Sequence, residues 1–378
     1  MRIAIFSAYF PPHIGGVEQY TLNIASQLTG MGHEVTVVTS SLDNNPKRDE
    51  FPFSIVEIPS VSVMGDRFPI VKPGAALHSA LARLKSQSFD GYVINTRYYP
   101  ICIIGCHLAK KNGKRPVLID HSSGYLSGEK TALGVCIRAY EKIATRLVAY
   151  FQPQTYAVSS RSGRWLEELG FAFLGTIPNS IDIDRHLALS SSRDWSDLDK
   201  ECTGIKVAYI GRLVKEKGVQ TAIEAVGLLR GQGEDVDLVI AGNGPLADGI
   251  ASLAEAHIHF VGALTPADVC SLMSNVDIFC YPSTYPEGLP SVLLEAAAHK
   301  LAIISSNCAG ALDVIPDSAY GTVLNDPSTT NFAKAIKHYY DNPANSAAVG
   351  KHVFQHVQKN FSWKTSAEKL IDALSQTE

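Results

Sequence analysis

The stretch "RIAIFSAYFPPHIGGVEQYTLNIASQLTGMGHEVTVVTS", Arg2–Ser40, decides the fold that we expect for this chain. Residues 2–10 form an apolar run with β-branched side chains, and residues 33–40 form a second such run. Between them, residues 15–32 gather apolar side chains toward one side at helical spacing and end on glycines. The order predicts a strand–helix–strand unit. Strands that are apolar almost throughout are typical of a parallel sheet covered on both faces.

The alternation of strand and helix continues along the chain in two blocks. In the first block, further strands are predicted at "GYVINT", "PVLIDHSS" and "TYAVSS", up to about Ser160. The polar segment Ile177–Gly204 then interrupts the pattern and is predicted to be a linker. In the second block, strands are predicted at "KVAYIGRL", "VDLVIAGNG", "IHFVGAL", "VDIFCYPS", "LAIISS" and "GTVLN".

These two blocks predict an α/β protein with two Rossmann-like parallel-sheet domains that face each other across a cleft. We expect an N-terminal domain at residues 1–182 and a C-terminal domain at residues 183–361. Residues 362–378 have helical spacing, and we expect this helix to pack back on the first domain. Because ligands of such sheets bind at the carboxyl ends of the strands, the ligand is expected in the cleft.

Length and composition agree with a two-domain globular protein. A chain of 378 residues is too long for one ordinary hydrophobic core. Its apolar content of 46% is that of a soluble globular protein. No apolar run reaches the roughly 18 residues that would span a bilayer, and the N-terminus starts directly as a strand. We therefore expect a cytoplasmic protein.

Cysteine and charge patterns add two expectations. The seven cysteines form no CxxC pair and are predicted to be free thiols, with no disulfide or zinc role. Residues 1–180 carry 18 Lys or Arg against 13 Asp or Glu, whereas residues 181–378 carry 15 against 24. The excess of positive charge indicates a basic face in the first half that could meet an anionic surface or acceptor. Ordinary variation of surface residues would explain it equally well.

The stretch "YPEGLPSVLLEAAAHK", Tyr285–Lys300, places one carboxylate before a predicted helix and a second one inside it. Pro290 is expected in the first helical turn, so that the backbone amides around it form an anion site suited to a diphosphate. Glu287 would lie on one side of that anion, and Glu295 about 7 Å down the helix. Such a pair suits a nucleotide sugar. Taken alone, the two residues are better explained as a capping residue and a solvated one.

Other loops that follow apolar strands strengthen the first interpretation. Arg212 and Lys217 in "YIGRLVKEKG" come directly after a strand, where two cations could hold the β-phosphate of a leaving nucleotide. Gly15 and Gly16 open the first helix and offer a second anion site. His121, next to Asp120, lies at another strand end, where it could equally be a loop histidine bonded to the backbone.

Together, "GGVEQY", "YIGRLVKEKG", "VIAGNGP", "FVGALTPADV" and "YPEGLPSVLLEAAAHKLAIISS" resemble glycosyltransferase family 4. The likeness covers essentially the whole chain and is strongest in the E-x7-E element and the G-R-x4-K pattern. It implies the GT-B fold and a retaining, nucleotide-sugar-dependent glycosyltransferase. The stretch "PNSID", Pro178–Asp182, resembles the family's P-N-G-[IV]-D junction, with Ser180 in place of the usual Gly.

The resemblance also implies a role for each matching residue. Arg212 and Lys217 match the pair that neutralises the donor diphosphate, and His121 matches the histidine near the transferred sugar. Glu287 matches the acid that contacts sugar hydroxyls, and Glu295 the acid on the nucleotide ribose. The backbone of the remaining positions is implied in donor binding: Gly15 and Gly16 at the diphosphate, Gly288 and Leu289 at sugar and phosphate, and Gly242, Asn243 and Gly244 on the base side.

The expected reaction moves a sugar from a nucleoside-diphosphate sugar to an acceptor hydroxyl, with no cofactor and no metal. No DxD lies beside a predicted strand end, and "DID" at 182–184 falls in the linker. Three alternatives stay open. A GT-B nucleotide-sugar epimerase would need no acceptor, and a non-catalytic nucleotide-sugar-binding protein would bind without turnover. A nicotinamide dehydrogenase would use "GNGPLADG", which lacks the third glycine at the required spacing.

The acceptor is expected to be a glycan or a lipid-linked saccharide, in cell-surface polysaccharide or glycolipid assembly. In "GVCIRAYEKIATRLVAYF", Gly134–Phe151, three cations recur along one face of a predicted helix: Arg138, Lys142 and Arg146. Such a helix can lie on an anionic membrane, which would give peripheral contact with its inner face. The pattern is somewhat better explained by an ordinary amphipathic helix whose apolar side packs on the sheet. No nucleic-acid partner is expected.

Overall fold

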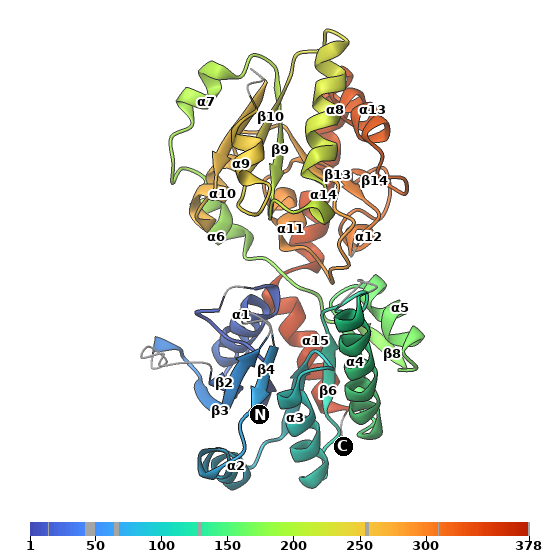
Figure 1. Cartoon of the computed structure of the whole chain (residues 1–378). Helices are drawn as coiled ribbons and strands as arrows, with labels where there is room; N and C mark the ends of the chain where they lie inside the picture. The colour runs from blue at the N-terminus through green and yellow to red at the C-terminus, as the bar shows by residue number, and fades with distance from the viewer. Residues whose placement is uncertain are drawn as a thin grey trace. The chain divides into compact units, whose positions relative to one another are not determined.

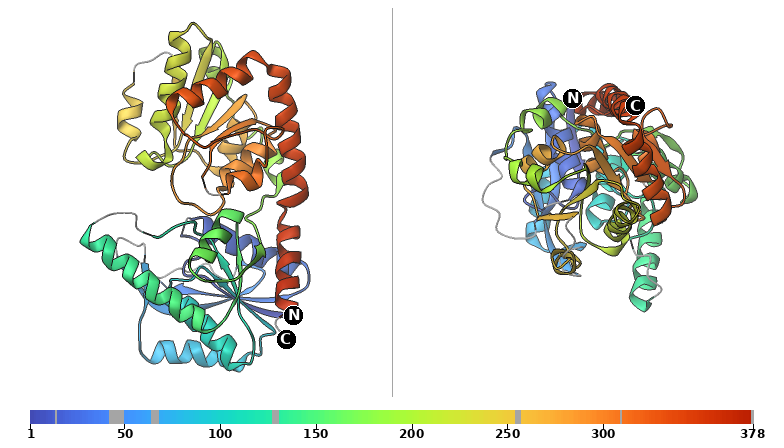
Figure 2. Two further views of the ribbon diagram at one scale, coloured as in Figure 1. Left: turned by 90° about the vertical axis from the view of Figure 1, so that its right-hand side faces the viewer. Right: turned by 90° about the horizontal axis from the view of Figure 1, so that it is seen from above.

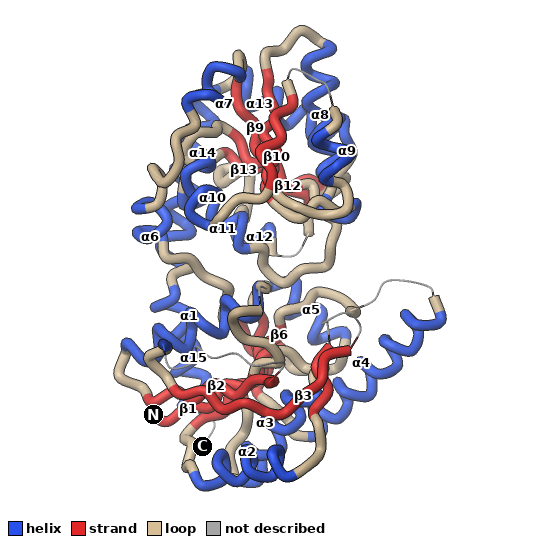
Figure 3. The backbone as a smooth tube through the Cα atoms, turned by 60° about the vertical axis from the view of Figure 1, so that its left-hand side comes forward, coloured by secondary structure: helices blue, strands red, loops and turns tan. Residues whose placement is uncertain are grey.

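The computed structural model describes residues 1–13, 15–41, 50–63, 68–126, 131–253, 257–308 and 310–376. By its contacts, the chain divides into two compact units, each with its own sheet (Figures 1 and 3). The first unit consists of Met1–Asn179, Glu287–Leu289 and Trp363–Glu378. The second consists of Ser180–Pro286 and Pro290–Ser362. The first unit therefore includes three residues of the loop before α11 (Ser291–Ala298).

The first unit is built on an eight-stranded sheet in the order β4-β3-β2-β1-β5-β6-β7-β8. All neighbouring strands are parallel except β3 and β4, which pair antiparallel at one edge. The strands are β1 (Arg2–Phe6), β2 (Glu34–Ser41), β3 (Ser54–Val63), β4 (Phe68–Val71), β5 (Gly91–Asn95), β6 (Val117–Asp120), β7 (Gln154–Ala157) and β8 (Phe173–Thr176). Among these, β3, β4 and β8 were not predicted.

Six helices pack in the described part of the first unit. Buried apolar residues of β1 and β5 and of the helix α3 form its core, among them Phe6, Ile94 and Cys102. The helix at the end of the chain, α15, lies against α1, where Trp363 contacts Tyr20 edge to face at 5.7 Å between ring centroids. The helices are α1 (Gly16–Gly30), α2 (Ala75–Ser86), α3 (Pro100–Lys111), α4 (Ala132–Tyr150), α5 (Ser160–Glu168) and α15 (Trp363–Ser375).

The second unit is built on a six-stranded sheet in the order β11-β10-β9-β12-β13-β14, in which every neighbouring pair is parallel. The parallel sheets predicted for both blocks are thus confirmed, apart from the antiparallel edge of the first. The strands are β9 (Ile205–Ile210), β10 (Val236–Ala241), β11 (Ile258–Gly262), β12 (Ile278–Tyr281), β13 (Ala302–Ser306) and β14 (Thr322–Leu324).

Helices cover this sheet, and two of them lie in a segment that was predicted to be a linker without helices. The segment Ile177–Gly204, predicted to be a linker, contains α6 and α7, which Asp182 and Trp195 precede as caps. The remaining helices follow the strands in sequence. The helices of the unit are α6 (Ile183–Ala188), α7 (Ser196–Glu201), α8 (Val219–Gly231), α9 (Ala247–Ala251), α10 (Pro266–Met273), α11 (Ser291–Ala298), α12 (Ala311–Val314), α13 (Thr329–Asp341) and α14 (Pro343–Asn360), with the 3₁₀ helix η2 (Lys215–Lys217).

None of the helices in the described part of the chain combines the length and the apolar character that crossing a membrane would require.

Candidate functional site

In the second unit, the predicted residues follow strands at the centre of the sheet. β9 lies between β10 and β12, so the strand order reverses beside it, and ligands of open α/β sheets bind at such a point. The loops after β9 and β10 are joined by backbone hydrogen bonds. Leu213 N donates to Asn243 O at 2.9 Å, and Leu246 N donates to Leu213 O at 3.1 Å. These bonds place the loop of Arg212 directly beside the turn of Asn243.

Gly242 and Gly244 allow this close pairing of the two loops. Their φ angles are 146° and 156°, a region that other residues rarely adopt. A Cβ atom on Gly242 would lie 1.9 Å from the carbonyl oxygen of Gly211, and one on Gly244 would lie 2.5 Å from that of Leu213. The close pairing of the two loops therefore requires glycine at both positions.

The two predicted cations differ in their surroundings. Lys217 is only 9% exposed, and its Nζ donates to the hydroxyl of Tyr281 at 3.1 Å. Its ammonium lies 5.5 Å from the ring centroids of both Tyr281 and Tyr285, within the range of a cation–π contact. Arg212, in contrast, is exposed. The buried lysine has a fixed position, whereas the arginine is accessible to solvent.

The helix that carries Glu295 begins one residue later than predicted. α11 starts at Ser291, and Pro290 is its N-cap with an extended ψ of 122°, so the proline is not in the first turn. The backbone of Pro290 is extended and not helical, so the first residue of the helix is Ser291. Glu295 is partly buried; burial raises the pKa of its carboxyl, and a hydrogen bond from Ser291 opposes the rise.

In the first unit, Gly15 and Gly16 follow β1, beside the point where the strand order reverses between β1 and β5. Gly15 is the extended N-cap of α1, and a Cβ atom there would lie 2.2 Å from the carboxylate of Glu18. That carboxylate is bonded to Nδ1 of His13 at 2.9 Å. Gly16 has no neighbouring atom within 4 Å of the place of a Cβ atom. At the start of α1, the carboxylate of Glu18 therefore fills the space beside Gly15, whereas the space beside Gly16 is empty.

His121 follows β6 and is held by aromatic and polar neighbours. The ring of Tyr20 packs edge to face on it at 4.7 Å, and its Nε2 lies 3.4 Å from Oδ1 of Asn95. Burial lowers the pKa of His121 to about 3. The imidazole is therefore neutral at physiological pH, so it can exchange hydrogen bonds with a ligand but carries no positive charge.

Glu287, Gly288 and Leu289 lie beside His121 within the first unit. Glu287 forms an isolated antiparallel bridge with Ser122, and a Cβ atom on Gly288 would lie 2.6 Å from the carbonyl oxygen of His121. Asn179 Nδ2 donates to Leu289 O at 3.4 Å. The first unit thus brings these residues together with His121, and it also contains Gly15 and Gly16. The second unit contains Arg212, Lys217, Gly242, Asn243, Gly244 and Glu295.

A buried charge network under this loop was missed by the sequence reasoning. Arg97 is fully buried, and its guanidinium donates to Asp120 at 2.5 Å, to Glu141 at 2.5 Å and to Ser122 at 2.6 Å. Burial raises the pKa of Asp120, and the charge of Arg97 opposes the rise. The network fixes Ser122, the residue that pairs with Glu287. Arg97 comes two residues after the end of β5, and this position is a signal in the sequence, but it does not say that the arginine is buried.

Two groups of side chains in the described residues could hold a metal ion. One consists of His186, Cys270 and His299, and the other of Cys202, Asp237 and His259. None of the predicted site residues belongs to either group.

Two family models match this chain. Residues 14–185 match the model described as Glycosyltransferase Family 4, and residues 196–356 match the model described as Glycosyl transferases group 1. Together they account for most of the chain.

Relatives and a solved structure agree with these matches. An uncharacterized glycosyltransferase of Methanocaldococcus jannaschii is 24% identical over 98% of this chain and 97% of its own. A phosphatidyl-myo-inositol mannosyltransferase of Mycobacterium tuberculosis is 28% identical over 86% of this chain and 82% of its own. The fold is similar to that of the Anabaena protein HepE in complex with UDP, with a TM-score of 0.76, 16% identity and full coverage of both chains. HepE was also solved with UDP-glucose, at a TM-score of 0.72.

Proposed function

This chain belongs to the family 4-like glycosyltransferases of the GT-B fold, and from that premise we propose that it takes its sugar from a nucleoside-diphosphate sugar and transfers it with retained anomeric configuration. The observation that carries the proposal is the pairing of the loops after β9 and β10. It holds Arg212 and Asn243 side by side at the carboxyl edge of the second sheet, where Lys217 is also fixed. The UDP and UDP-glucose complexes of HepE support a nucleotide-sugar donor.

In the proposed reaction, negative charge grows on the leaving phosphate, and the second unit provides two cationic side chains to stabilise it. The bond between the anomeric carbon and the β-phosphate oxygen breaks, and the acceptor oxygen bonds to the same face of that carbon. The departing phosphate oxygen takes the acceptor's proton. Arg212 and Lys217 stabilise the charge that grows on this oxygen. Glu287 positions sugar hydroxyls and does not attack the sugar, and neutral His121 exchanges a hydrogen bond with the sugar.

A thermal-shift screen of UDP-, GDP- and ADP-sugars tests the donor class. A ligand at about 100 times its Kd stabilises the folded protein by roughly 2.7 kcal/mol, so the true donor should raise the Tm clearly. A matched nucleoside monophosphate serves as control, because it lacks the β-phosphate that Arg212 and Lys217 are proposed to bind. A chain that responds to none of these diphosphate donors would contradict the proposal.

We also propose that the transfer needs no metal ion, since two cationic side chains are available for the diphosphate. Turnover with EDTA and without added divalent cation should then equal turnover with Mg²⁺. Strict dependence on Mg²⁺ or Mn²⁺ would contradict this part of the proposal.

For the acceptor, we propose a lipid-linked saccharide that the protein meets at an anionic membrane through α4. The buried side of this helix includes Glu141, Ala144 and Val148. Its outer side still carries large apolar residues at i, i+4 and i+7: Ile143 (57% exposed), Leu147 (47%) and Tyr150 (68%). Lys142 and Arg146 are exposed on the same helix. Figure 2 shows that α4 runs along the outside of its unit and extends beyond the sheet.

Such a helix suits the interface of a membrane, where apolar side chains enter the lipid and basic ones meet anionic headgroups. The lipid in the name of the mycobacterial phosphatidyl-myo-inositol mannosyltransferase agrees with this setting. A protein that worked there would take part in glycolipid or surface-polysaccharide assembly.

Flotation with anionic liposomes tests the membrane proposal. The wild type should float at low salt and sediment at high salt, because basic residues contribute about 1 kcal/mol each near such a surface. The double variant Ile143→Ser, Leu147→Ser should float much less. Leu228→Ser, at a leucine 44% exposed on α8, is the matched control and should float like the wild type. Equal flotation of both variants would contradict a role for α4.

A further inference from the structure

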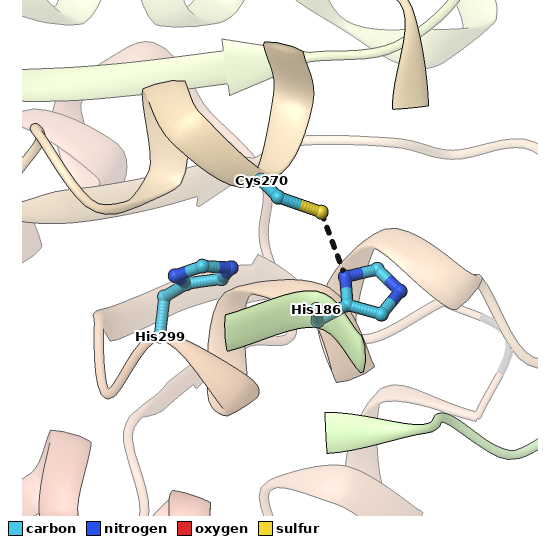
Figure 4. Close-up of side chains that lie close together, drawn as sticks. All are labelled: His186, Cys270 and His299. Atoms are coloured by element: carbon cyan, nitrogen blue, oxygen red, sulfur yellow. Dashed lines mark hydrogen bonds between the residues drawn. The ribbon is translucent and has the colours of Figure 1, made fainter. Parts of the chain in front are cut away.

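Three side chains that commonly bind metals converge in the second unit, and none of them is used by the proposed transfer. His186 lies on α6, Cys270 on α10, and His299 directly after α11. Each offers one ligand atom, and these atoms all lie within 4.8 Å of one another. Figure 4 shows the three side chains pointing toward one common space, each from a different element.

The hydrogen bonds of His299 leave one of its nitrogens without a partner. Ser274 Oγ donates its only proton to the carbonyl oxygen of Cys270 at 3.2 Å. With its proton used in this way, the hydroxyl accepts a hydrogen bond from Nδ1 of His299, at 2.9 Å, in the tautomer that carries the proton on Nδ1. The other nitrogen, Nε2, then carries a lone pair. Among the described residues it is buried and has no hydrogen-bond partner, and in Figure 4 the ring points toward the other two side chains.

This arrangement is the one that metal-binding histidines adopt. Such a histidine usually donates its second ring N–H to a neighbouring group, which fixes the tautomer and the ring orientation. Ser274 has that role for His299. Unpartnered polar atoms in a protein interior are rare, and a metal ion would account for the lone pair of Nε2.

The distances and the ligand types suit zinc. Zn²⁺ binds sulfur at about 2.3 Å and imidazole nitrogen at about 2.0–2.1 Å, so neighbouring ligand atoms in a tetrahedral site lie about 3.3–3.6 Å apart. The sulfur of Cys270 lies 3.1 Å from Nδ1 of His186, and small side-chain shifts would bring all three ligand atoms to that spacing. Cysteine sulfur and imidazole nitrogen are the ligand types that zinc prefers.

The protonation states agree with this geometry. Burial lowers the pKa of His186. Burial and the nearby His186 lower the pKa of His299 to about 4. Both imidazoles are therefore in the neutral form that binds metals. Burial and the charge of Glu295 raise the pKa of Cys270 to about 11. The thiol would lose its proton on binding, because a coordinating divalent cation outweighs such a shift.

A metal ion would also explain how α6 is fixed. The helix has six residues and none of them is buried, so burial of apolar side chains contributes little to holding it in place. It nevertheless contacts both α10 and α11. We propose that His186, Cys270 and His299 bind one Zn²⁺ ion that fastens α6 to these two helices, with a water molecule in the fourth position.

The second group of possible ligands supplies a control. Among the described residues, Nε2 of its His259 also lacks a hydrogen-bond partner, but it lies 3.6 Å from the carboxylate of Asp237. The carboxylate of Asp237 already accepts hydrogen bonds from the backbone of Thr203 and Gly204 and from the guanidinium of Arg230. Its negative charge is therefore compensated within the protein. Cys202 and His259 beside it can be replaced without touching the proposed zinc ligands.

Zinc binding is measured on the full chain, stripped with a chelator and titrated with Zn²⁺ against a chromophoric zinc indicator. We expect one equivalent to bind. Cys270→Ser and, separately, His299→Gln should weaken binding at least ten-fold, whereas Cys202→Ser should bind like the wild type. Zn²⁺ should raise the Tm of the wild type and of Cys202→Ser, but not that of the other two variants. Circular dichroism establishes that each variant is folded.

Substitution with Co²⁺ tests the thiolate ligand directly. The wild type should show a near-ultraviolet charge-transfer band from a thiolate bound to cobalt, and Cys270→Ser should lose this band. A wild type that does not compete with the indicator for Zn²⁺, or binding that Cys270→Ser leaves unchanged, would overturn the proposal. The experiment contains no sugar nucleotide, so its failure leaves the proposed transfer untouched, and a failed donor screen leaves the zinc site untouched.

Discussion

At the scale of single residues, Lys217 gives the sharpest prediction about the transfer. Its ammonium is fixed by Tyr281 and lies over two aromatic rings, so it is preorganised for the charge that develops on the leaving phosphate. Lys217→Ala should lower kcat by about 10²-fold, as the loss of one such donor does in other enzymes. Lys215→Ala, at an exposed lysine of the same 3₁₀ turn, is the control and should keep wild-type kcat. Similar rates for all three proteins would contradict the role of Lys217.

His121 leads to a prediction about stability and pH. Its folded-state pKa of about 3 lies below the ordinary value of 6.5, so protonation favours the unfolded chain. The contribution of His121 to the stability of the wild type should therefore be complete above pH 6.5 and should be lost as the pH drops toward 3. His121→Gln should lose less stability between pH 7 and pH 5 than the wild type, as measured by urea unfolding.

Replacing the exposed His107 by Gln is the control for this comparison and should follow the wild type. Buried carboxyls with a raised pKa, such as Asp120, act in the opposite direction, but they are present in every variant and cancel in the difference. A pH dependence of His121→Gln that equals that of the wild type would show that the imidazole is not buried in its neutral form.

Position after an apolar strand was enough to predict that Arg212 and Lys217 lie at the carboxyl edge of one sheet and His121 at that of the other, because the carboxyl ends of parallel strands meet at one edge of a sheet. The same rule did not identify Arg97. Nothing in its local sequence says that an arginine will be buried, since burial of a charge depends on partners far along the chain. In this protein those partners are Asp120 and Glu141, which come 23 and 44 residues later.

At the scale of elements, the paired loops after β9 and β10 can be tested through Gly244. A side chain at this position would meet the carbonyl oxygen of Leu213 and would need a φ of 156°. Gly244→Ala should destabilise the protein by roughly 1–3 kcal/mol, the range for a residue held in an unfavourable backbone region. Gly249→Ala, on α9 with open space around it, should be neutral or slightly stabilising. Urea unfolding compares the two variants, and equal stabilities would contradict the proposed pairing constraint.

Elements with strong apolar patterns were predicted, and those without were missed. The central strands are apolar on both faces, which makes them visible in sequence. β3 alternates buried and exposed residues and contains Pro59, and β8 has four residues and contains Gly175. α6 and α7 have six residues each, in a segment whose Ser and Asp content is typical of loops. Such short helices depend on their caps and on tertiary contacts.

At the scale of the whole molecule, the grouping of distant segments was the part that sequence patterns could not supply. Glu287, Gly288 and Leu289 lie in the second block of the sequence but belong to the first unit by their contacts. The bridge from Glu287 to Ser122 and the contact of Gly288 with His121 join residues more than 160 positions apart. Local periodicity carries no information about such pairs, whereas it does predict a helix at the end of the chain.

That last helix supports a prediction about how the chain is stabilised. α15 buries five side chains in the first unit, and Leu374 packs on Gly91, where a Cβ atom would lie 2.7 Å from the leucine. Leu374→Ala should cost about 2–5 kcal/mol, as for other buried leucines. Because α15 lies against α1, amide hydrogen exchange should speed up in the first unit and stay unchanged in the second. Leu228→Ala, on the surface of α8, should leave both units unchanged. Faster exchange in the second unit alone would show that the end of the chain stabilises the other part of the protein.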